Sequence, residues 1–160
     1  MFGILVDPAS GTQSALPDLQ AAARTLGLQH IVVNAGTDSD LETAFSTFSQ
    51  QHVGAVLVGI SSLYNRRTGQ LAALAAHHAL PAIFPYREYA LVGGLMSYGS
   101  SLGYGFHQAG IYAARTGDKP ADLPVQQVTK IDLVINLKTG KALGITIPET
   151  LLATADEVIQ

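Results

Sequence analysis

The sequence predicts an α/β fold: a three-layer, doubly wound and mostly parallel sheet. The main observation is that short β-type runs alternate with longer helical runs, which is typical of parallel βαβ units. A length of 160 residues is enough to bury one sizeable core. An apolar content of 48% with 13% charged residues is typical of a compact protein rather than a disordered chain.

The first predicted unit is a strand at 2–6 and a helix at 12–26. The strand is apolar and ends at Pro8, because proline cannot continue a ladder of backbone hydrogen bonds. Apolar residues at helical spacing predict the helix, and Gly27 provides its C-terminal stop. These apolar positions are Ala15, Leu19, Ala22, Ala23 and Leu26.

The next two units continue the alternation. A strand at 30–34 precedes a helix that Thr37 or Asp38 caps, since either side chain can accept a hydrogen bond from a free N–H of the first turn. A strand at 54–59, rich in β-formers and bounded by glycines, precedes a helix at 66–79. The expected inward positions of the two helices are Leu41, Ala44, Phe45, Phe48, Leu71, Leu74 and Ala75.

In the second half of the chain, proline and glycine lie at the borders of the predicted elements. Prolines flank the first of its strands, and Gly93-Gly94 precedes the second. Alternating polar and apolar residues in the last strand are typical of a half-exposed or edge strand. The predicted elements are strands at 80–85 and 95–98, a helix at 101–115, a polar connector at 117–124, a strand at 130–135, a short helix at 137–143 stopped by Gly144, and a terminal helix after Pro148 carrying Leu151, Leu152 and Val158.

Composition argues against several classes of function. A net charge of -3 with a pI near 5.9 argues against nucleic acid as a partner, because a phosphate-binding surface needs clustered Lys and Arg. Arg66-Arg67 is interpreted as a solvated helix start rather than a phosphate clamp. No apolar run reaches the roughly 18 residues of a membrane helix, so no membrane insertion is expected. The absence of cysteine excludes disulfides, thiol catalysis and Cys-ligated metal.

No arrangement of residues predicts catalysis, a metal site or a cofactor. Ser61 and Ser62 lack a nucleophile-elbow pattern, because Leu63 stands where the closing glycine of G-x-S-x-G would be. The adjacent His77 and His78 point about 100° apart on a helix and cannot easily hold one metal. No glycine-rich phosphate loop of either standard form is present. A small enzyme with its site formed across a dimer is the weakest interpretation.

The loops that follow the predicted strands carry small hydroxyl residues, glycine and tyrosine. In an open parallel sheet, ligands bind beyond the carboxyl ends of the strands, where such loops and helix N-termini converge. For each single serine, capping a helix is the alternative role, and Arg87 could pair with a ligand carboxylate or with neighbouring Glu88 or Asp residues. The predicted ligand-binding residues are Ser10, Thr12, Ser61, Ser62, Tyr86, Arg87 and Tyr98.

Several long runs resemble a known family. Residues 80–89 (LPAIFPYREY) and then 93–99 (GGLMSYG) are similar to the ABC transporter substrate-binding proteins of the tryptophan/tyrosine transport type, and the runs at 119–127, 133–144 and 148–159 resemble them as well. The resemblance implies one lobe of a type I periplasmic-binding-protein fold, whose small-molecule ligand, an amino acid, lies in a cleft between two lobes. In that family the strand and loop at 4–9 begin the second lobe, commonly with asparagine where Asp7 stands here.

The resemblance covers the C-terminal half of a family member and divides this single lobe, 1–160, into three parts. Residues 1–98 form the core βα units, 99–129 a helix and connector that would pack on the absent first lobe or a neighbouring chain, and 130–160 the returning strand with C-terminal helices. The helix in the middle part has an apolar face that water would not solvate well. We therefore expect a homo-oligomer, such as a domain-swapped dimer.

The sequence thus predicts a solute-binding lobe of an ABC importer, not an enzyme, for an aromatic or other amino acid. It would work with an ABC permease as part of a full-length binding protein. The alternative is a truncated stand-alone module that self-assembles and has no tight ligand. The resemblance implies a periplasmic location, whereas a leaderless natural product would be cytoplasmic, because the short apolar opening lacks a basic leader and a cleavage site.

Overall fold

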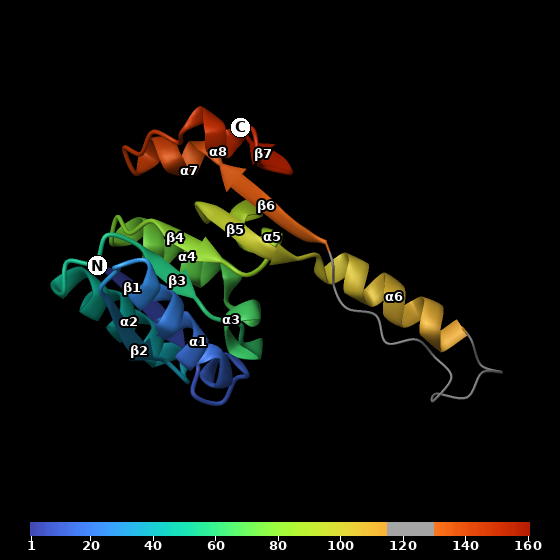
Figure 1. Ribbon diagram of the computed structural model, residues 1–160, viewed down its shortest axis with the longest axis horizontal. Coiled ribbons are helices and arrows are strands. Elements are labelled where there is room, and N and C mark those ends of the chain that lie inside the picture. The colour runs from blue at the N-terminus through green and yellow to red at the C-terminus, as the bar shows by residue number, and fades with distance from the viewer. Residues whose placement is uncertain (115–129) are drawn as a thin grey trace.

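The computed structural model describes residues 1–114 and 130–160, which form one sheet with helices on both of its faces (Figure 1). The described strands are β1 Phe2–Val6, β2 His30–Asn34, β3 Val56–Val58, β4 Ala82–Phe84, β5 Met96–Ser100, β6 Ile131–Asn136 and β7 Glu157–Ile159. Their order is β2-β1-β3-β4-β5-β6-β7, and among them the β5–β6 pair alone is antiparallel. The predicted α/β class with a mostly parallel sheet is confirmed.

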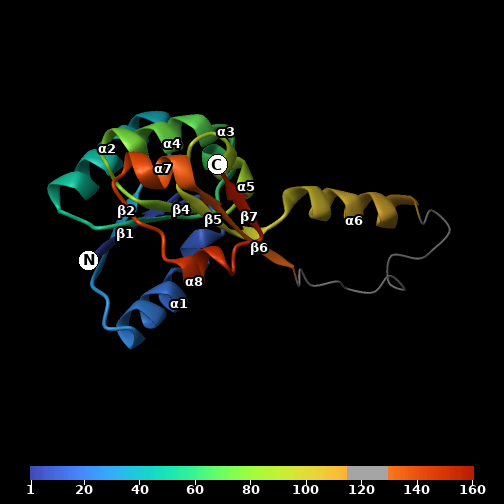
Figure 2. The ribbon, with the colours of Figure 1, turned by 90° about the horizontal axis from the view of Figure 1, so that it is seen from above.

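The helices make the outer layers. They are α1 Thr12–Thr25, α2 Asp38–Gln50, α3 Ser62–Arg66, α4 Thr68–His77, α5 Arg87–Leu91, α6 Leu102–Ala114, α7 Leu137–Ala142 and α8 Glu149–Leu152. In Figure 2, α2 and α4 lie on one side of the sheet, while α1 and α8 lie on the other. The three-layer arrangement therefore agrees with the prediction.

The core lies mainly between the sheet and helices α2 and α4. Thr37 caps α2 with a capping box, in which its side chain accepts from the N–H of Asp40 and the Asp40 carboxylate accepts from the N–H of Thr37. Phe45 and Phe48 are fully buried, with ring centroids 6.0 Å apart and an edge-to-face geometry. The predicted inward residues are all buried except Leu74, which is half-buried and packs against the core.

Several predicted boundaries were wrong. The helix at 66–79 is two helices, because Arg67 leaves helical geometry with φ −120° and ψ 27°. The loop after β4 becomes α5 at Arg87. The terminal helix is the four residues of α8, and Val158 instead belongs to β7, whose backbone groups pair with β6. Of the two predicted possibilities for β6, the edge strand is wrong, since β5 and β7 flank it. The half-exposed strand agrees with the structure, because Ile131 is exposed and the next two residues are half-buried.

Helix α1 packs loosely on its face of the sheet. Ala23 is its one buried residue, and Leu26 is 71% exposed. On the sheet beneath the helix, Leu57 of β3 and Ile83 of β4 are half-buried, although a covered strand would bury both. An apolar space therefore remains between α1 and the sheet.

Helix α6 leaves the body of the molecule at the end of β5 and extends away from it (Figures 1 and 2). None of its residues is buried, and Phe106 is 76% exposed. The connector predicted at 117–124 lies outside the described residues. Within residues 1–114 and 130–160, no helix has both the length and the apolar character that a membrane span requires.

Candidate functional site

Two adjoining pockets open at the carboxyl ends of the parallel strands. The polar pocket, of about 510 Å³, lies between the loops that follow β1 and β3, and the apolar pocket, of about 400 Å³, lies under the start of α1. Gly11 and Ile60 line both, so the two form one crevice. The polar pocket is lined by Asp7, Ala9, Ser10, Gly11, Gly36, Ile60, Ser61, Ser62, Leu63 and Arg66. The apolar pocket is lined by Gly11, Thr12, Ala15, Leu19, Leu57, Val58, Gly59, Ile60, Ile83, Phe84, Pro85 and Tyr98.

Asp7 follows β1 directly and is 8% exposed. One carboxylate oxygen, Oδ1, accepts a hydrogen bond of 2.9 Å from the N–H of Ala9. The other, Oδ2, accepts a short hydrogen bond from the Ser61 hydroxyl. Ser61 Oγ in turn caps α3 by accepting from the N–H of Leu63 at 3.0 Å. These bonds join the loop after β1 to the loop after β3 and fix the carboxylate in the pocket.

Thr12 ties the start of α1 to the same loop. Its hydroxyl donates to the Ile60 carbonyl at 3.0 Å and accepts from the Ile60 N–H at 2.8 Å. Gly59 allows this close approach, because a Cβ at that position would lie 2.8 Å from Thr12 Cγ2 and 2.9 Å from the Leu5 carbonyl oxygen. These two hydrogen bonds between Thr12 and Ile60, here called the clamp, therefore hold the boundary between the two pockets, because few apolar contacts hold α1 on the sheet.

Tyr64 of α3 follows Leu63, which lines the polar pocket. The side chain is fully buried, and its hydroxyl donates to the Ala35 carbonyl at 2.9 Å. Burial raises the pKa of the Tyr64 phenol well above its usual value, and the negative charge of Asp7 adds to the shift. The phenol consequently stays neutral and keeps its hydrogen bond across the physiological pH range.

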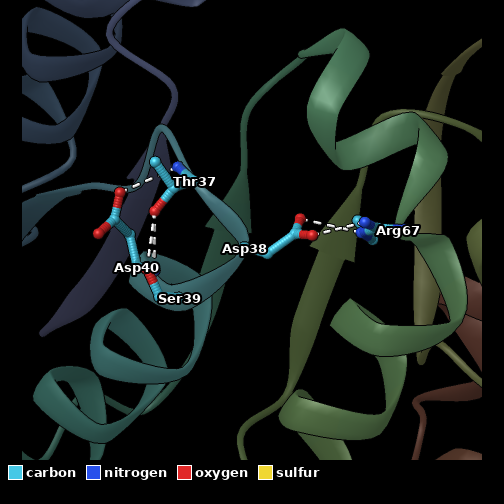
Figure 3. A network of polar contacts seen from close by, with 5 residues as sticks. All are labelled: Thr37, Asp38, Ser39, Asp40 and Arg67. Carbon is cyan, nitrogen blue, oxygen red and sulfur yellow. Dashed lines mark hydrogen bonds and ion pairs between the residues drawn. The ribbon is translucent and has the colours of Figure 1, made fainter.

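A polar network beside the pocket joins the start of α2 to the α3–α4 junction (Figure 3). Arg67 makes a two-point contact with Asp38, at 2.9 Å from Nε to Oδ1 and 2.5 Å from Nη2 to Oδ2. The hydrogen bond from Arg67 is the largest cause of the lowered pKa of the Asp38 carboxyl. The Asp40 carboxyl also has a lowered pKa, mainly through its hydrogen bond with Thr37. Gly36, one residue before this network, lines the polar pocket.

The structure brings five of the seven predicted ligand-binding residues to the crevice. Ser10, Ser61 and Ser62 line the polar pocket, whereas Thr12 and Tyr98 line the apolar pocket. Much of their hydroxyl capacity is used inside the protein, since Ser10 Oγ donates to the Asp7 carbonyl at 2.8 Å and Ser61 and Thr12 are bonded as described. Ser62 is exposed and has no hydrogen bond from its side chain within the described ranges.

Tyr86 and Arg87 line neither pocket. Tyr86 is half-buried against the core, and the Arg87 guanidinium pairs with Glu157 of β7 at 2.6 Å. The hydrogen bond from Arg87 to Glu157, which lies 70 residues further along the chain, is the main cause of the raised pKa of Arg87. Arg87 is therefore engaged with a carboxylate of the protein, and one that the sequence did not suggest.

Sequence reasoning missed two charged residues of the polar pocket, Asp7 and Arg66. The position of Asp7 after a buried strand was the available signal, but such residues also form ordinary turns. The sequence predicts a solvated helix start at Arg66. The side chain is exposed, but Arg66 ends α3 and lines the pocket. Across residues 1–114 and 130–160, no group of three or more His, Cys, Asp or Glu side chains could hold a metal ion.

Solved structures share this architecture. A conserved domain protein from Vibrio cholerae superposes with a TM-score of 0.84 at 24% identity, over 98% of this chain and 54% of that one. An ABC domain from Streptococcus pneumoniae in complex with L-Trp gives a TM-score of 0.83 at 25% identity, over 99% and 56% of the two chains. A ligand-free, open substrate binding protein with adhesive properties from Clostridium difficile gives 0.69 at 18% identity, over 99% and 54%. The chain thus spans about half the length of these structures.

The family match covers nearly the whole chain. The model for ABC transporter substrate binding proteins matches residues 3–159, and no match is found among curated protein sequences. Members of this family bind small-molecule ligands, work with ABC permeases and are not enzymes. Together with the one-lobe architecture and the crevice at the carboxyl ends of its strands, this match shows that the chain belongs to the ABC transporter substrate binding proteins.

Proposed function

We propose that this chain is the solute-binding lobe of an ABC importer and that its ligand is an amino acid with an aromatic or other apolar side chain. The observation that carries the proposal is a crevice with two unlike halves. The polar pocket offers hydroxyl and charged groups, and the adjoining apolar pocket offers a surface of aliphatic and aromatic side chains. A pocket of about 400 Å³ is within the usual range for a small ligand.

Tyr98 in the apolar pocket can contact the ligand side chain, and the start of α1 can contact a polar group of the ligand. Tyr98 is 57% exposed at the apolar pocket and can stack on a flat side chain. Helix α1 begins after Gly11 without a side-chain cap. The N–H groups of Gln13 and Ser14 bond to the Ser10 and Gly11 carbonyls, so what the helix start offers a polar ligand group is the partial positive charge of its N-terminus. A similar structure, the Streptococcus pneumoniae ABC domain, holds L-Trp. The crevice is open, and a second wall from the rest of a full-length binding protein would enclose the ligand.

Calorimetric titration with L-tryptophan tests this proposal. The parent chain should bind it, and Tyr98→Ala should weaken binding about tenfold, since a stacked aromatic pair contributes about 0.5–1.5 kcal/mol beyond its buried area. Leu26→Ala is the control, because Leu26 is an exposed apolar residue just after α1 that lines neither pocket and lies outside α6. A parent chain that binds no amino acid at millimolar concentration would refute the assignment.

Tyr86 and Arg87 stay in the proposal as a predicted extension of the site. Loss of binding in Tyr86→Ala or Arg87→Ala, with the fold intact, would extend the ligand contacts to the start of α5. Unchanged binding would limit the site to the two pockets. The Arg87–Glu157 pair has side chains about 40% exposed, so breaking it should change stability by less than about 1 kcal/mol.

We also propose that α6 is covered in solution by a second copy of this chain. Tyr104, Phe106 and Ile111 are 42%, 76% and 40% exposed on a helix that buries no residue. Apolar side chains that gather on one projecting helix favour association. Light scattering should then show a dimer that dissociates on Phe106→Glu, and a monomer at micromolar concentration would contradict this.

The periplasm and an ABC permease are the proposed location and partner, since both follow from the family rather than from any contact seen here. The alternative function is a stand-alone module that self-assembles and holds no tight ligand, which the exposure of α6 favours. If the chain assembles through α6 and binds no amino acid in calorimetric titration, the stand-alone module is the correct function rather than the solute-binding lobe.

A further inference from the structure

The polar pocket contains a buried carboxylate that pairs with no Lys or Arg of the described residues. Asp7 is 8% exposed, and its two carboxylate oxygens accept from a backbone N–H and a serine hydroxyl. Within residues 1–114 and 130–160, Asp7 forms no ion pair. A buried carboxylate without a positive partner is costly, even when hydrogen-bonded. The carboxylate also lines the pocket, so a ligand can supply the missing positive charge.

Arg66 provides the opposite charge on the wall of the same pocket. Its neighbour Arg67 is occupied by Asp38, whereas Arg66 is exposed and has no ion pair or hydrogen bond from its side chain among the described residues. The charge of Arg66 also contributes, less than that of Arg67, to the lowered pKa of Asp38, but its guanidinium donates to no carboxylate among the described residues. It can therefore donate to a carboxylate that enters the pocket, and arginine suits such planar two-point pairing. The pocket thus presents one fixed negative and one available positive group.

We infer that the polar pocket recognises the zwitterionic head of an amino acid, with Asp7 accepting from its ammonium group and Arg66 donating to its carboxylate. The inference rests on the proposed function and specifies the ligand chemistry of that site. Gly11 and Ile60 border both pockets, so a ligand held by its head group can direct its side chain into the apolar pocket. Asp7 also repels a ligand that is only an anion, which makes the ammonium a condition for tight binding.

Three indole probes separate the two charges. L-tryptophan has both, tryptamine has the ammonium alone, and indole-3-propionate has the carboxylate alone. Their affinities would be measured by titration calorimetry at neutral pH for the parent chain, Asp7→Asn and Arg66→Gln. Arg24→Gln is the matched control, because Arg24 lies in the last turn of α1 and lines neither pocket.

Each variant should lose affinity only for the probes that carry the charge it no longer recognises. Asp7→Asn should weaken L-tryptophan and tryptamine about 10- to 100-fold, the range of one charge-assisted hydrogen bond, and leave indole-3-propionate unchanged or tighter. Arg66→Gln should weaken L-tryptophan and indole-3-propionate while sparing tryptamine. A misfolded variant would instead lose all three probes, and Ser61→Ala, which keeps the Asp7 charge but removes a neighbour, should retain the preference for the ammonium.

Two outcomes overturn the inference in distinguishable ways. If the parent chain binds L-tryptophan and folded Asp7→Asn binds it equally well, or loses all three probes equally, the role of Asp7 is wrong while the binding function stands. If the parent chain binds neither L-tryptophan nor tryptamine, the proposed function fails and the inference fails with it.

Discussion

The clamp between Thr12 and Ile60 gives a sharp test of how the crevice is built. Thr12 Oγ1 is both donor and acceptor toward the backbone of Ile60, 48 residues further along the chain. Because α1 buries only Ala23, this clamp has few apolar contacts to replace it. Thr12→Val keeps the shape of the side chain and removes both hydrogen bonds, so its effect measures the clamp.

The expected magnitude follows from the two bonds. Each intramolecular hydrogen bond contributes a net of about 0.5–1.5 kcal/mol. The Ile60 groups lie near water and can be solvated when the clamp is lost, so the lower part of the range applies and the free energy of unfolding should fall by about 1–2 kcal/mol. For a chain of this length, each kcal/mol corresponds to roughly 2–4 °C, which gives a decrease in Tm of roughly 2–8 °C.

Thermal unfolding followed by circular dichroism measures this decrease. Ser14→Ala is the matched control, since the Ser14 hydroxyl donates within its own turn to the Gly11 carbonyl at 2.7 Å and its loss should change stability by about 0.5 kcal/mol or less. The same Thr12→Val variant should respond less to L-tryptophan, because Ile60 borders both pockets. A decrease no larger than that of Ser14→Ala would show that the clamp does not hold α1.

Other predictions concern the core, the network beside the pocket and one close backbone contact. Phe45→Ala should lower the free energy of unfolding by about 3–5 kcal/mol in urea titrations, because the ring is fully buried; a loss below about 1 kcal/mol would contradict the packing. The pKa of Asp38 is lowered chiefly by its hydrogen bond from Arg67, so the pair stabilises the fold above the ordinary value of 3.8 and this contribution is lost as the pH falls through the lower folded-state pKa. Asp38→Asn should therefore flatten the acid limb of the stability curve, most clearly at low salt, and an unchanged limb would count against the pair. Gly99→Ala should destabilise the chain and weaken L-tryptophan binding, because a Cβ would lie 2.0 Å from the Pro85 carbonyl oxygen; normal thermal stability would contradict that approach.

The sequence alone determined the features that depend on neighbouring residues. The helical spacing of Leu41, Phe45 and Phe48 predicted the buried face of α2, and all three are fully buried. Gly27 and Gly144 end helices with φ of 66° and 68°, as their positions predicted. The hydroxyl-bearing loops after β1 and β3 also meet in the polar pocket, because parallel strands place successive loops on the same edge of the sheet.

Only the tertiary structure decided which groups meet across those loops. The Asp7–Ser61 and Arg87–Glu157 contacts join residues 54 and 70 positions apart, and no local pattern encodes such distances. Whether Arg87 is free for a ligand depended on β7, which pairs with β6 and carries Glu157. Periodicity reports which face of an element is apolar, whereas the partner of a charged side chain depends on the order of the strands, and that order is a property of the whole sheet.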